Sequence, residues 1–107
     1  MESKQSTNLP LSQIVRAKLE GSVEAMERLS REERGLQARE TLGNDYNATR
    51  KFISDGFPHL TAYLPPEAEV QESTRGDKGW TAQRYSELLV FCRQMLHLMN
   101  LQVRSES

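Results

Sequence analysis

Residues 84–103, RYSELLVFCRQMLHLMNLQV, constrain the fold more than any other feature, because they are unusually apolar for one helix in a chain of 107 residues. On a helix, one face would carry apolar side chains at three- and four-residue spacing: Tyr85, Leu88, Leu89, Cys92, Met95, Leu96, Met99 and Val103. Phe91 and Leu98 add a second stripe. A helix that is apolar around more than half its circumference must be covered from two sides. We therefore predict a central helix that is covered by its own chain, by a second subunit or by a partner.

The first part of the chain supplies one covering face. Apolar residues recur there at helical spacing, with charged residues between them: Leu11, Ile14, Val15, Leu19, Val23, Met26 and Leu29. Ser30-Arg31-Glu32-Glu33 has the S-x-x-E form of a capping box, so residues 11–42 form either one long helix or two. Gly43 is expected to end the helix in either case, since Gly favours a C-cap and the following Asn44-Asp45 favours a new N-cap.

The remaining segments are shorter. Residues 46–54 predict a third helical piece, which Gly56 and Pro58 interrupt, and residues 59–64 predict one or two further turns before Pro65-Pro66. Residues 65–79, PPEAEVQESTRGDKG, have almost no apolar anchors and are expected to form a mobile surface loop. The last helix is expected to begin near Trp80, with Thr81 as its N-cap.

These patterns predict an all-α fold, in which two long, roughly antiparallel helices are joined by short connecting helices. A hydrophobic content of 36% is enough for one modest core but not for two. We expect a disordered N-terminus over residues 1–9 and a single helical domain over residues 10–104, with the mobile loop at 65–79.

The net charge of the chain and the composition of its N-terminus limit the possible partners and cellular location. Fourteen basic and fifteen acidic residues give a formal net charge of -1, so the chain as a whole has no electrostatic attraction to nucleic acid or anionic lipid. The first fifteen residues contain no apolar run of signal-peptide length, and we interpret the protein as cytoplasmic and not anchored in a membrane.

Residues capable of catalysis or metal binding are few. His59 and His97 are the only histidines, and neither has Asp, Glu or Cys at a spacing that builds a zinc or catalytic site. The single cysteine, Cys92, cannot form an internal disulfide and is interpreted as apolar filling. The sequence has no nucleophile elbow and no glycine-rich phosphate loop. We therefore predict no enzymatic activity, no catalytic residues, no cofactor and no bound metal.

A basic segment, RLSREERGLQAR, contains Arg28, Arg31, Arg34 and Arg39. It also contains Glu32 and Glu33, so its net charge is close to zero, and such interleaving is typical of a solvated, salt-bridged helix face. Direct nucleic-acid binding is thus disfavoured.

Partner binding is the remaining functional class, because aromatic, Arg and Met side chains are enriched at protein interfaces. The candidate partner-binding residues are Phe57, Leu60, Tyr63, Trp80, Tyr85, Phe91 and Leu98. Residues expected in the core or in a homodimer seam are Leu88, Leu89, Cys92, Met95, Leu96 and Met99. The sequence pattern leaves open which apolar residues belong to the core and which to an interface.

One further pattern spans about half of the chain. Its points are Arg50-Lys51 followed by Phe52-Ile53, the Leu64-Pro65 helix stop with Glu67 behind it, a polar Gly-containing loop, and Arg84-Tyr85 opening a long helix with Gln94-Met95. This order of features resembles the small helical quorum-sensing antiactivators of the TraM and QslA type, which bind LuxR-type transcription regulators and silence them. The first helical region, the extra Pro66 and the loop length depart from that pattern.

The resemblance implies a dimeric helical protein that acts by stoichiometric binding, without a cofactor or turnover. The function expected from it is sequestration of a LuxR-type regulator, which blocks the regulator's dimerisation or DNA binding. Two alternatives remain open: a small helical nucleic-acid-binding regulator, and a structural or scaffold subunit of a helical complex.

Overall fold

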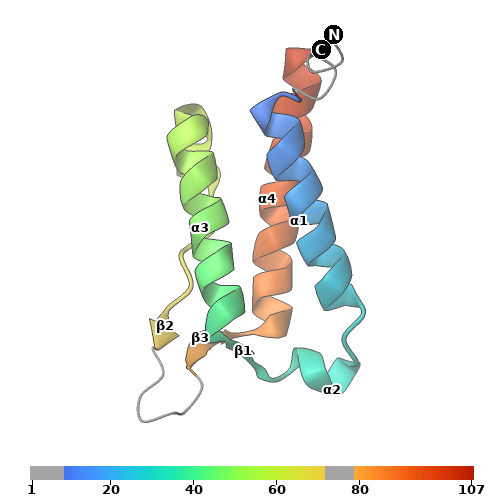
Figure 1. Ribbon diagram of the computed structural model, residues 1–107, viewed down its shortest axis with the longest axis vertical. Coiled ribbons are helices and arrows are strands. Elements are labelled where there is room, and N and C mark those ends of the chain that lie inside the picture. The colour runs from blue at the N-terminus through green and yellow to red at the C-terminus, as the bar shows by residue number, and fades with distance from the viewer. Residues whose placement is uncertain (1–8, 72–78) are drawn as a thin grey trace, which may run out of the picture.

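The computed structural model describes residues 9–71 and 79–107, which form a mostly helical fold with a small sheet (Figure 1). In chain order the elements are α1 (Leu11–Glu27), α2 (Arg31–Arg34), β1 (Gln37–Arg39), α3 (Glu40–Gly56), the 3-10 helix η2 (Pro58–Tyr63), β2 (Val70–Gln71), β3 (Trp80–Arg84) and α4 (Tyr85–Glu106). The prediction of an all-α fold is therefore corrected to a largely helical fold with three short strands. Strands of two, three and five residues are too short for alternation of polar and apolar residues to identify them in the sequence.

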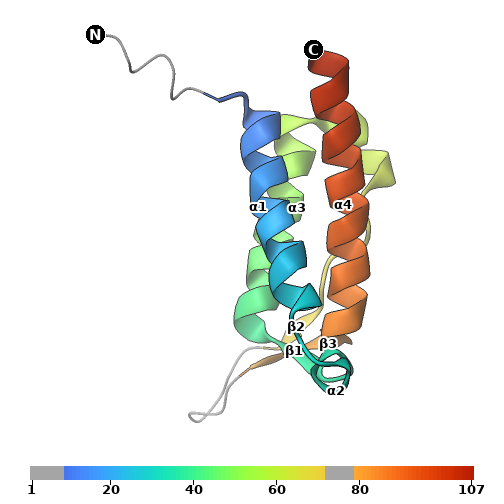
Figure 2. The same cartoon turned by 90° about the vertical axis from the view of Figure 1, so that its right-hand side faces the viewer.

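α1 and α4, the two helices predicted to be long, pack side by side and run in opposite directions (Figures 1 and 2), as predicted. The third helical piece, predicted over residues 46–54, is longer than expected, because α3 has 17 residues, as many as α1. Ser12, in the first turn of α1, donates a hydrogen bond to Glu106 in the last turn of α4. The seam between the helices is closed by apolar side chains that are 1% exposed or less, among them Leu19, Leu88 and Met95. The apolar stripe of α4 is thus covered on this side by the chain's own first helix.

The capping box predicted from the sequence is formed at the start of α2. The Glu33 amide donates to Ser30 Oγ at 3.1 Å, and the Ser30 amide donates to Glu33 Oε1 at 2.8 Å. Residues 11–42 were predicted to form either one long helix or two, and the structure shows that α1 and α2 are separate helices. The second of them is a single turn, because residues 37–39 leave it to pair with β3.

Gly43 does not end a helix, contrary to the prediction; it lies within α3. A Cβ at this position would overlap Thr81 Cγ2 and lie 3.0 Å from Val70 Cγ2. Glycine is therefore required because α3 packs tightly against the sheet here, and not because a left-handed cap is needed.

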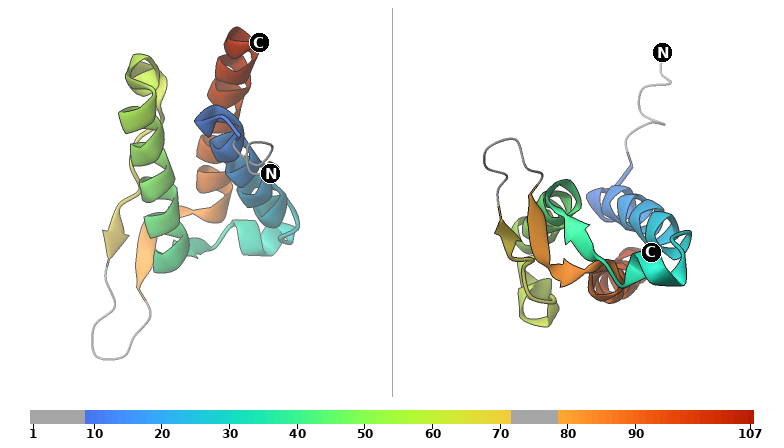
Figure 3. Two further views of the ribbon diagram at one scale, coloured as in Figure 1. Left: turned by 45° about the horizontal axis from the view of Figure 1, so that its top comes forward. Right: turned by 90° about the horizontal axis from the view of Figure 1, so that it is seen from below.

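The sheet lies across one end of the helices (Figure 3), with strand order β1-β3-β2 and antiparallel pairing throughout. Arg39 pairs with Trp80, and Val70 pairs with Thr81. Thr81 is buried within β3 and its hydroxyl donates to Gln83 O at 2.7 Å, so the prediction that Thr81 caps the last helix was wrong. The strand continues to Arg84, and α4 begins only at Tyr85.

The chain between α3 and the sheet returns along α3 in an extended conformation. The predicted breakers Gly56 and Pro58 lie where α3 gives way to η2, and Pro65 follows η2. Within the range predicted as a mobile loop, residues 65–71 make defined hydrogen bonds to α3 and β3. The rest of that prediction, residues 72–78, and all but the last residue of the predicted disordered N-terminus lie outside the described residues.

Candidate functional site

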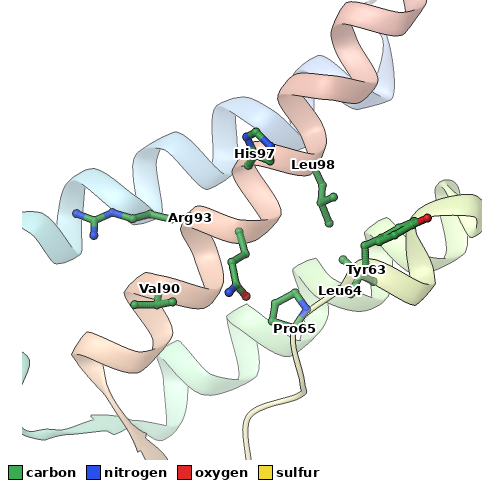
Figure 4. A pocket seen from close by; sticks show the side chains of 8 residues that line it. Tyr63, Leu64, Pro65, Val90, Arg93, His97 and Leu98 are labelled. Carbon is green, nitrogen blue, oxygen red and sulfur yellow. The ribbon is translucent and has the colours of Figure 1, made fainter.

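The candidate site is a groove between α4 and residues 63–65, which end η2 and begin the extended segment (Figure 4). Its volume is about 710 Å³, and it is lined by Tyr63, Leu64, Pro65, Val90, Arg93, Gln94, His97 and Leu98. Tyr63 is 70% exposed and Val90 is 48% exposed, whereas Pro65 is buried. The groove is therefore an open surface hollow with a mainly apolar lining.

Side chains of α3 form hydrogen bonds with the backbone of residues 65–68, and these bonds fix the position of the wall formed by residues 63–65. Arg50 Nε donates to Pro65 O at 2.6 Å, and Tyr46 Oη donates to Pro66 O at 2.7 Å. The Asn47 side chain both donates to Ala68 O, at 2.9 Å, and accepts from Ala68 N, at 2.8 Å. These contacts hold a segment that has few apolar anchors of its own, so the groove has a defined shape.

The other wall is the outer face of α4. Val90, Arg93 and His97 follow one another at three- and four-residue spacing, which places them on one side of a helix. Figure 4 shows Arg93 directed away from Pro65, and its guanidinium binds Glu27 of α1 at 2.7 Å. The positive charge of Arg93 is thus engaged outside the groove, whose polar edge consists of Gln94 and His97.

The seven residues predicted to bind a partner do not form one surface. Only Tyr63 and Leu98 lie together, in this groove. Phe57 and Leu60 are 7% and 9% exposed and belong to the core in this conformation. Tyr85 and Phe91 are partly buried against the core, and Phe91 packs on Tyr46 with ring centroids 6.0 Å apart.

The remaining predicted residue, Trp80, lies on the sheet. It is 41% exposed, and the Arg39 guanidinium lies 5.1 Å from the centre of its ring. Trp80 does not line the groove of Tyr63 and Leu98, so Tyr63 and Trp80 mark separate surfaces.

The residues predicted for the core or a dimer seam are mostly in the core of the single chain. Leu88, Leu89, Cys92, Met95 and Met99 are buried, and Leu96 is partly buried. The apolar surface of α4 is therefore largely buried within the chain, by α1 on one side and by α3 on the other, where Phe91 packs on Tyr46.

Several surface residues were missed by the sequence analysis. Ile14 was assigned to the core face of the first helix, but it is 51% exposed; Leu11 is 37% exposed. Phe52 is 54% exposed, whereas its neighbour Ile53 is fully buried. Adjacent helical residues lie about 100° apart, so Phe52 and Ile53 point in different directions, and helical periodicity could have indicated that they differ in exposure.

The titratable groups that are clearly perturbed do not form a catalytic arrangement. Burial, together with the nearby Asp45 charge, raises the pKa of the Cys92 thiol to about 11. Burial also raises the pKa of Tyr46, with Cys92 nearby acting in the same direction. Hydrogen bonds from Gln102 and Ser12 lower the pKa of Glu106, which lies at the surface. Burial therefore favours the protonated form of the Cys92 thiol at neutral pH.

Among residues 9–71 and 79–107, no three His, Cys, Asp or Glu side chains are grouped so that they could hold a metal ion. No helix in the same described part of the chain combines the length and hydrophobicity needed to cross a membrane. No protein-family model, curated protein or solved structure matches the chain significantly. Its function must therefore be inferred from its own residues and their arrangement.

Proposed function

We propose that this chain is a non-catalytic, protein-binding regulator whose partner occupies the groove between α4 and residues 63–65. The observation that carries the proposal is the exposure of Tyr63 and Val90 beside Leu98 in a hollow of about 710 Å³. Exposed apolar surface that surrounds a hollow commonly marks an interaction site, and interface energy concentrates in aromatic anchors such as tyrosine.

The lining of the groove indicates the type of segment that fits. Along α4 it extends from Val90 to Leu98, which is about 12 Å or two helical turns. Its lining contains no carboxylate, and its polar edge is formed by an amide and an imidazole. A short amphipathic helix that places two or three apolar side chains between Leu98 and Pro65 matches this geometry.

The finer proposal is that the partner is a transcription regulator of the LuxR type, which the chain sequesters so that it cannot dimerise or bind DNA. Its support is the similarity to small quorum-sensing antiactivators in the order of sequence features, together with an exposed apolar groove that a stoichiometric binder needs. The expected location of such a regulator complex is the cytoplasm.

The test is titration of the protein into a complex of a LuxR-type regulator with its promoter DNA. DNA should be released at a stoichiometric ratio, and Tyr63→Ala or Leu98→Ala should weaken regulator binding about 25-fold, the effect of losing a typical anchor. Trp80→Ala is the matched control, because it removes an exposed aromatic residue that does not line the groove. Persistence of the DNA complex at large excess of protein would contradict sequestration. Equal weakening of regulator binding by all three variants would contradict binding of the regulator in this groove.

A second candidate function is nucleic-acid binding, which one observation favours. Arg39 and Trp80 are exposed, neighbouring side chains on the sheet, and aromatic rings with adjacent cations can stack on bases. We rank it second because two neighbouring arginines are already engaged: Arg34 and Arg84 donate to backbone carbonyls of this chain. A gel-shift assay with random duplex and single-stranded DNA at low salt separates the two functions, since Trp80→Ala should abolish a shift due to this surface.

A further inference from the structure

Four side chains form a continuous series of hydrogen bonds near the C-terminal end of α4. Ser12 Oγ of α1 donates to Glu106 Oε1, and Gln102 Nε2 donates to Glu106 Oε2 at 2.7 Å. His59 Nε2 of η2 lies 2.6 Å from Gln102 Oε1. This series, which we call the relay, joins α1, α4 and η2 through side chains that are far apart in the sequence.

The direction of each bond in the relay follows from what its members can donate. Ser12 is 1% exposed, and a buried hydroxyl needs a partner, which Glu106 supplies. The hydrogen bonds from Gln102 and Ser12 lower the pKa of Glu106, so its carboxylate is ionised and only accepts. The amide nitrogen of Gln102 therefore faces Glu106 and its oxygen faces η2. His59 consequently donates from Nε2 to the Gln102 oxygen.

The bond between His59 and Gln102 lies in line with the groove. Gln102 follows Leu98 by four residues, so it lies on the same side of α4, one turn beyond the groove. His59 precedes Tyr63 within the same 3-10 helix, η2. Figure 4 shows Leu98 directed from α4 toward Tyr63 and Leu64. The His59–Gln102 bond thus joins the two elements that face each other across the groove, one turn further along α4.

The other contacts of η2 hold it on α3 and on the core. Leu60 is buried, and Thr61 Oγ1 lies 3.0 Å from Ser54 Oγ of α3. Within residues 9–71 and 79–107, the bond between His59 and Gln102 is the one hydrogen bond that joins η2 to α4. The core and α3 therefore keep η2 folded, whereas this bond fixes η2 in the direction across the groove.

We propose that His59 and Gln102 are positioning residues for the groove, which hold η2 at a fixed separation from α4. Ser12 and Glu106 support them by orienting the Gln102 amide. Neither His59 nor Gln102 lines the groove, so both act through the placement of Tyr63. Without their bond, η2 stays on α3 but can move away from α4, and a partner then meets a groove that is no longer preformed. The consequence for binding rests on the proposed function, whereas the placement of η2 does not.

Pulsed electron paramagnetic resonance tests the placement of η2 without any partner. Spin labels at Ala62→Cys in η2 and Leu101→Cys in α4 report the separation, because both positions are exposed and lie outside the groove and the relay. Cys92 is buried, so the labels attach at the introduced cysteines. The labelled chain should give one narrow distance distribution. His59→Ala or Gln102→Ala, added to it, should broaden the distribution and lengthen its mean.

Ser105→Ala is the matched control for this measurement. It removes a hydrogen bond at the same end of α4, from Ser105 Oγ to Gln102 O at 2.8 Å, without touching the relay, and should leave the distances unchanged. A distribution that is unchanged in both His59→Ala and Gln102→Ala would overturn the proposal, as would an equal change in Ser105→Ala.

Binding of a LuxR-type regulator tests the consequence for the groove. His59→Ala and Gln102→Ala should each raise the dissociation constant about 2- to 10-fold, the effect of one lost hydrogen bond. The double variant should bind no more weakly than either single variant, because all three lose the same bond. Ser12→Ala should act in the same direction although it lies on α1, whereas Ser22→Ala, on the same helix but outside the relay, should not.

Urea unfolding of the same variants separates positioning from a general loss of stability. His59→Ala should unfold at nearly the wild-type urea concentration, because Leu60 keeps η2 on the core. If the regulator binds through Tyr63 and Leu98 but His59→Ala and Gln102→Ala bind it as well as the wild type, the positioning role is overturned and the proposed function stands. If the distances change as expected but the wild type does not bind the regulator, the proposed function fails and the placement of η2 by the relay stands.

Discussion

The two faces of α1 differ in how completely they are covered. Toward α4, the side chain of Leu19 is buried in a closed seam, and the α4 side chains Leu88 and Met95 are fully buried as well. Toward α3, Ile14 and Phe52 remain half exposed on the two sides of an open hollow. The same helix therefore contributes one face to the core and leaves the other partly exposed to solvent.

The difference follows from the way α3 is held in place. α3 packs on the sheet at Gly43, and Tyr46, Asn47 and Arg50 bind the backbone of residues 65–68. These contacts fix the helix without requiring α1 to close over Phe52. A helix that is anchored by hydrogen bonds on one side can leave apolar surface open on the other.

The largest effect should come from breaking the closed seam. Leu19→Ala or Met95→Ala leaves a cavity in a fully buried site and should lower the free energy of unfolding by about 2–5 kcal/mol. Ile14→Ala and Phe52→Ala remove half-exposed side chains and should cost about 1 kcal/mol or less. Urea unfolding measures both. Equal costs on the two faces would contradict the contrast between them.

Alkaline pH should lower the free energy of unfolding through the buried thiol of Cys92. The thiol in the unfolded chain loses its proton near its ordinary pKa of 9.0, whereas the buried thiol keeps it until about pH 11. The unfolded state binds fewer protons in this window, so stability present below pH 9 is lost as the pH rises to 11. The loss from this group is about 2–3 kcal/mol, and Tyr46 acts in the same direction.

Urea unfolding at about pH 8 and about pH 11 measures this loss. Cys92→Ala should show a smaller decrease between the two pH values, even if it is less stable at both. If the variant and the wild type lose the same free energy, Cys92 does not contribute to alkaline unfolding.

The hydrogen bonds between α3 and residues 65–68 should contribute less to the free energy of unfolding than the apolar packing between α1 and α4. Asn47→Ala removes both bonds to Ala68 and leaves a buried residue's amide without its partner, at a cost of about 1–2 kcal/mol. It should also loosen residues 63–65, so partner binding in the groove should weaken. Asn44→Ala, at an exposed position on the same helix, is the control. Comparable effects of the two variants would contradict a specific role of the Asn47–Ala68 hydrogen bonds.

The smallest effect is expected from the ion pair at the edge of the seam. Arg93 and Glu27 are 2.7 Å apart but 51% and 44% exposed, so solvent screens them, and a double-mutant cycle should give about 0.2–1 kcal/mol. The coupling should decrease in high salt. A coupling energy of several kcal/mol would mean that polar contacts, and not apolar packing, close the seam.

The parts of the fold that depend on local sequence were predictable. The apolar periodicity identified the helices at 11–27 and 85–106 approximately, and Ser30 with Glu33 identified a capping box that is formed. Gly56 and Pro58 marked the end of α3 correctly. In each case neighbouring residues along the chain supply the interaction, so the signal is present in a short window.

The candidate sites were predictable only in part. Tyr63 and Leu98 were recognised by residue type, but their joint groove requires the Pro65 segment to be held near α4 by Arg50 and Tyr46. Phe57 has the same interface-prone aromatic character as Tyr63, yet it is buried. Residue type indicates which side chains are capable of binding, whereas packing decides which of them are exposed.

The sequence by itself determined a helical chain with one amphipathic and one strongly apolar long helix, because helical periodicity is a local property. Only the tertiary structure decided the role of Gly43, whose residue type predicts a helix stop but which is the point where α3 touches the sheet. It also decided that residues 80–84 pair as a strand with β1 and β2, both of which lie well outside the local sequence window. Short strands gain their stability from hydrogen bonds to distant segments, so their formation depends on the assembled fold and leaves little trace in the local sequence.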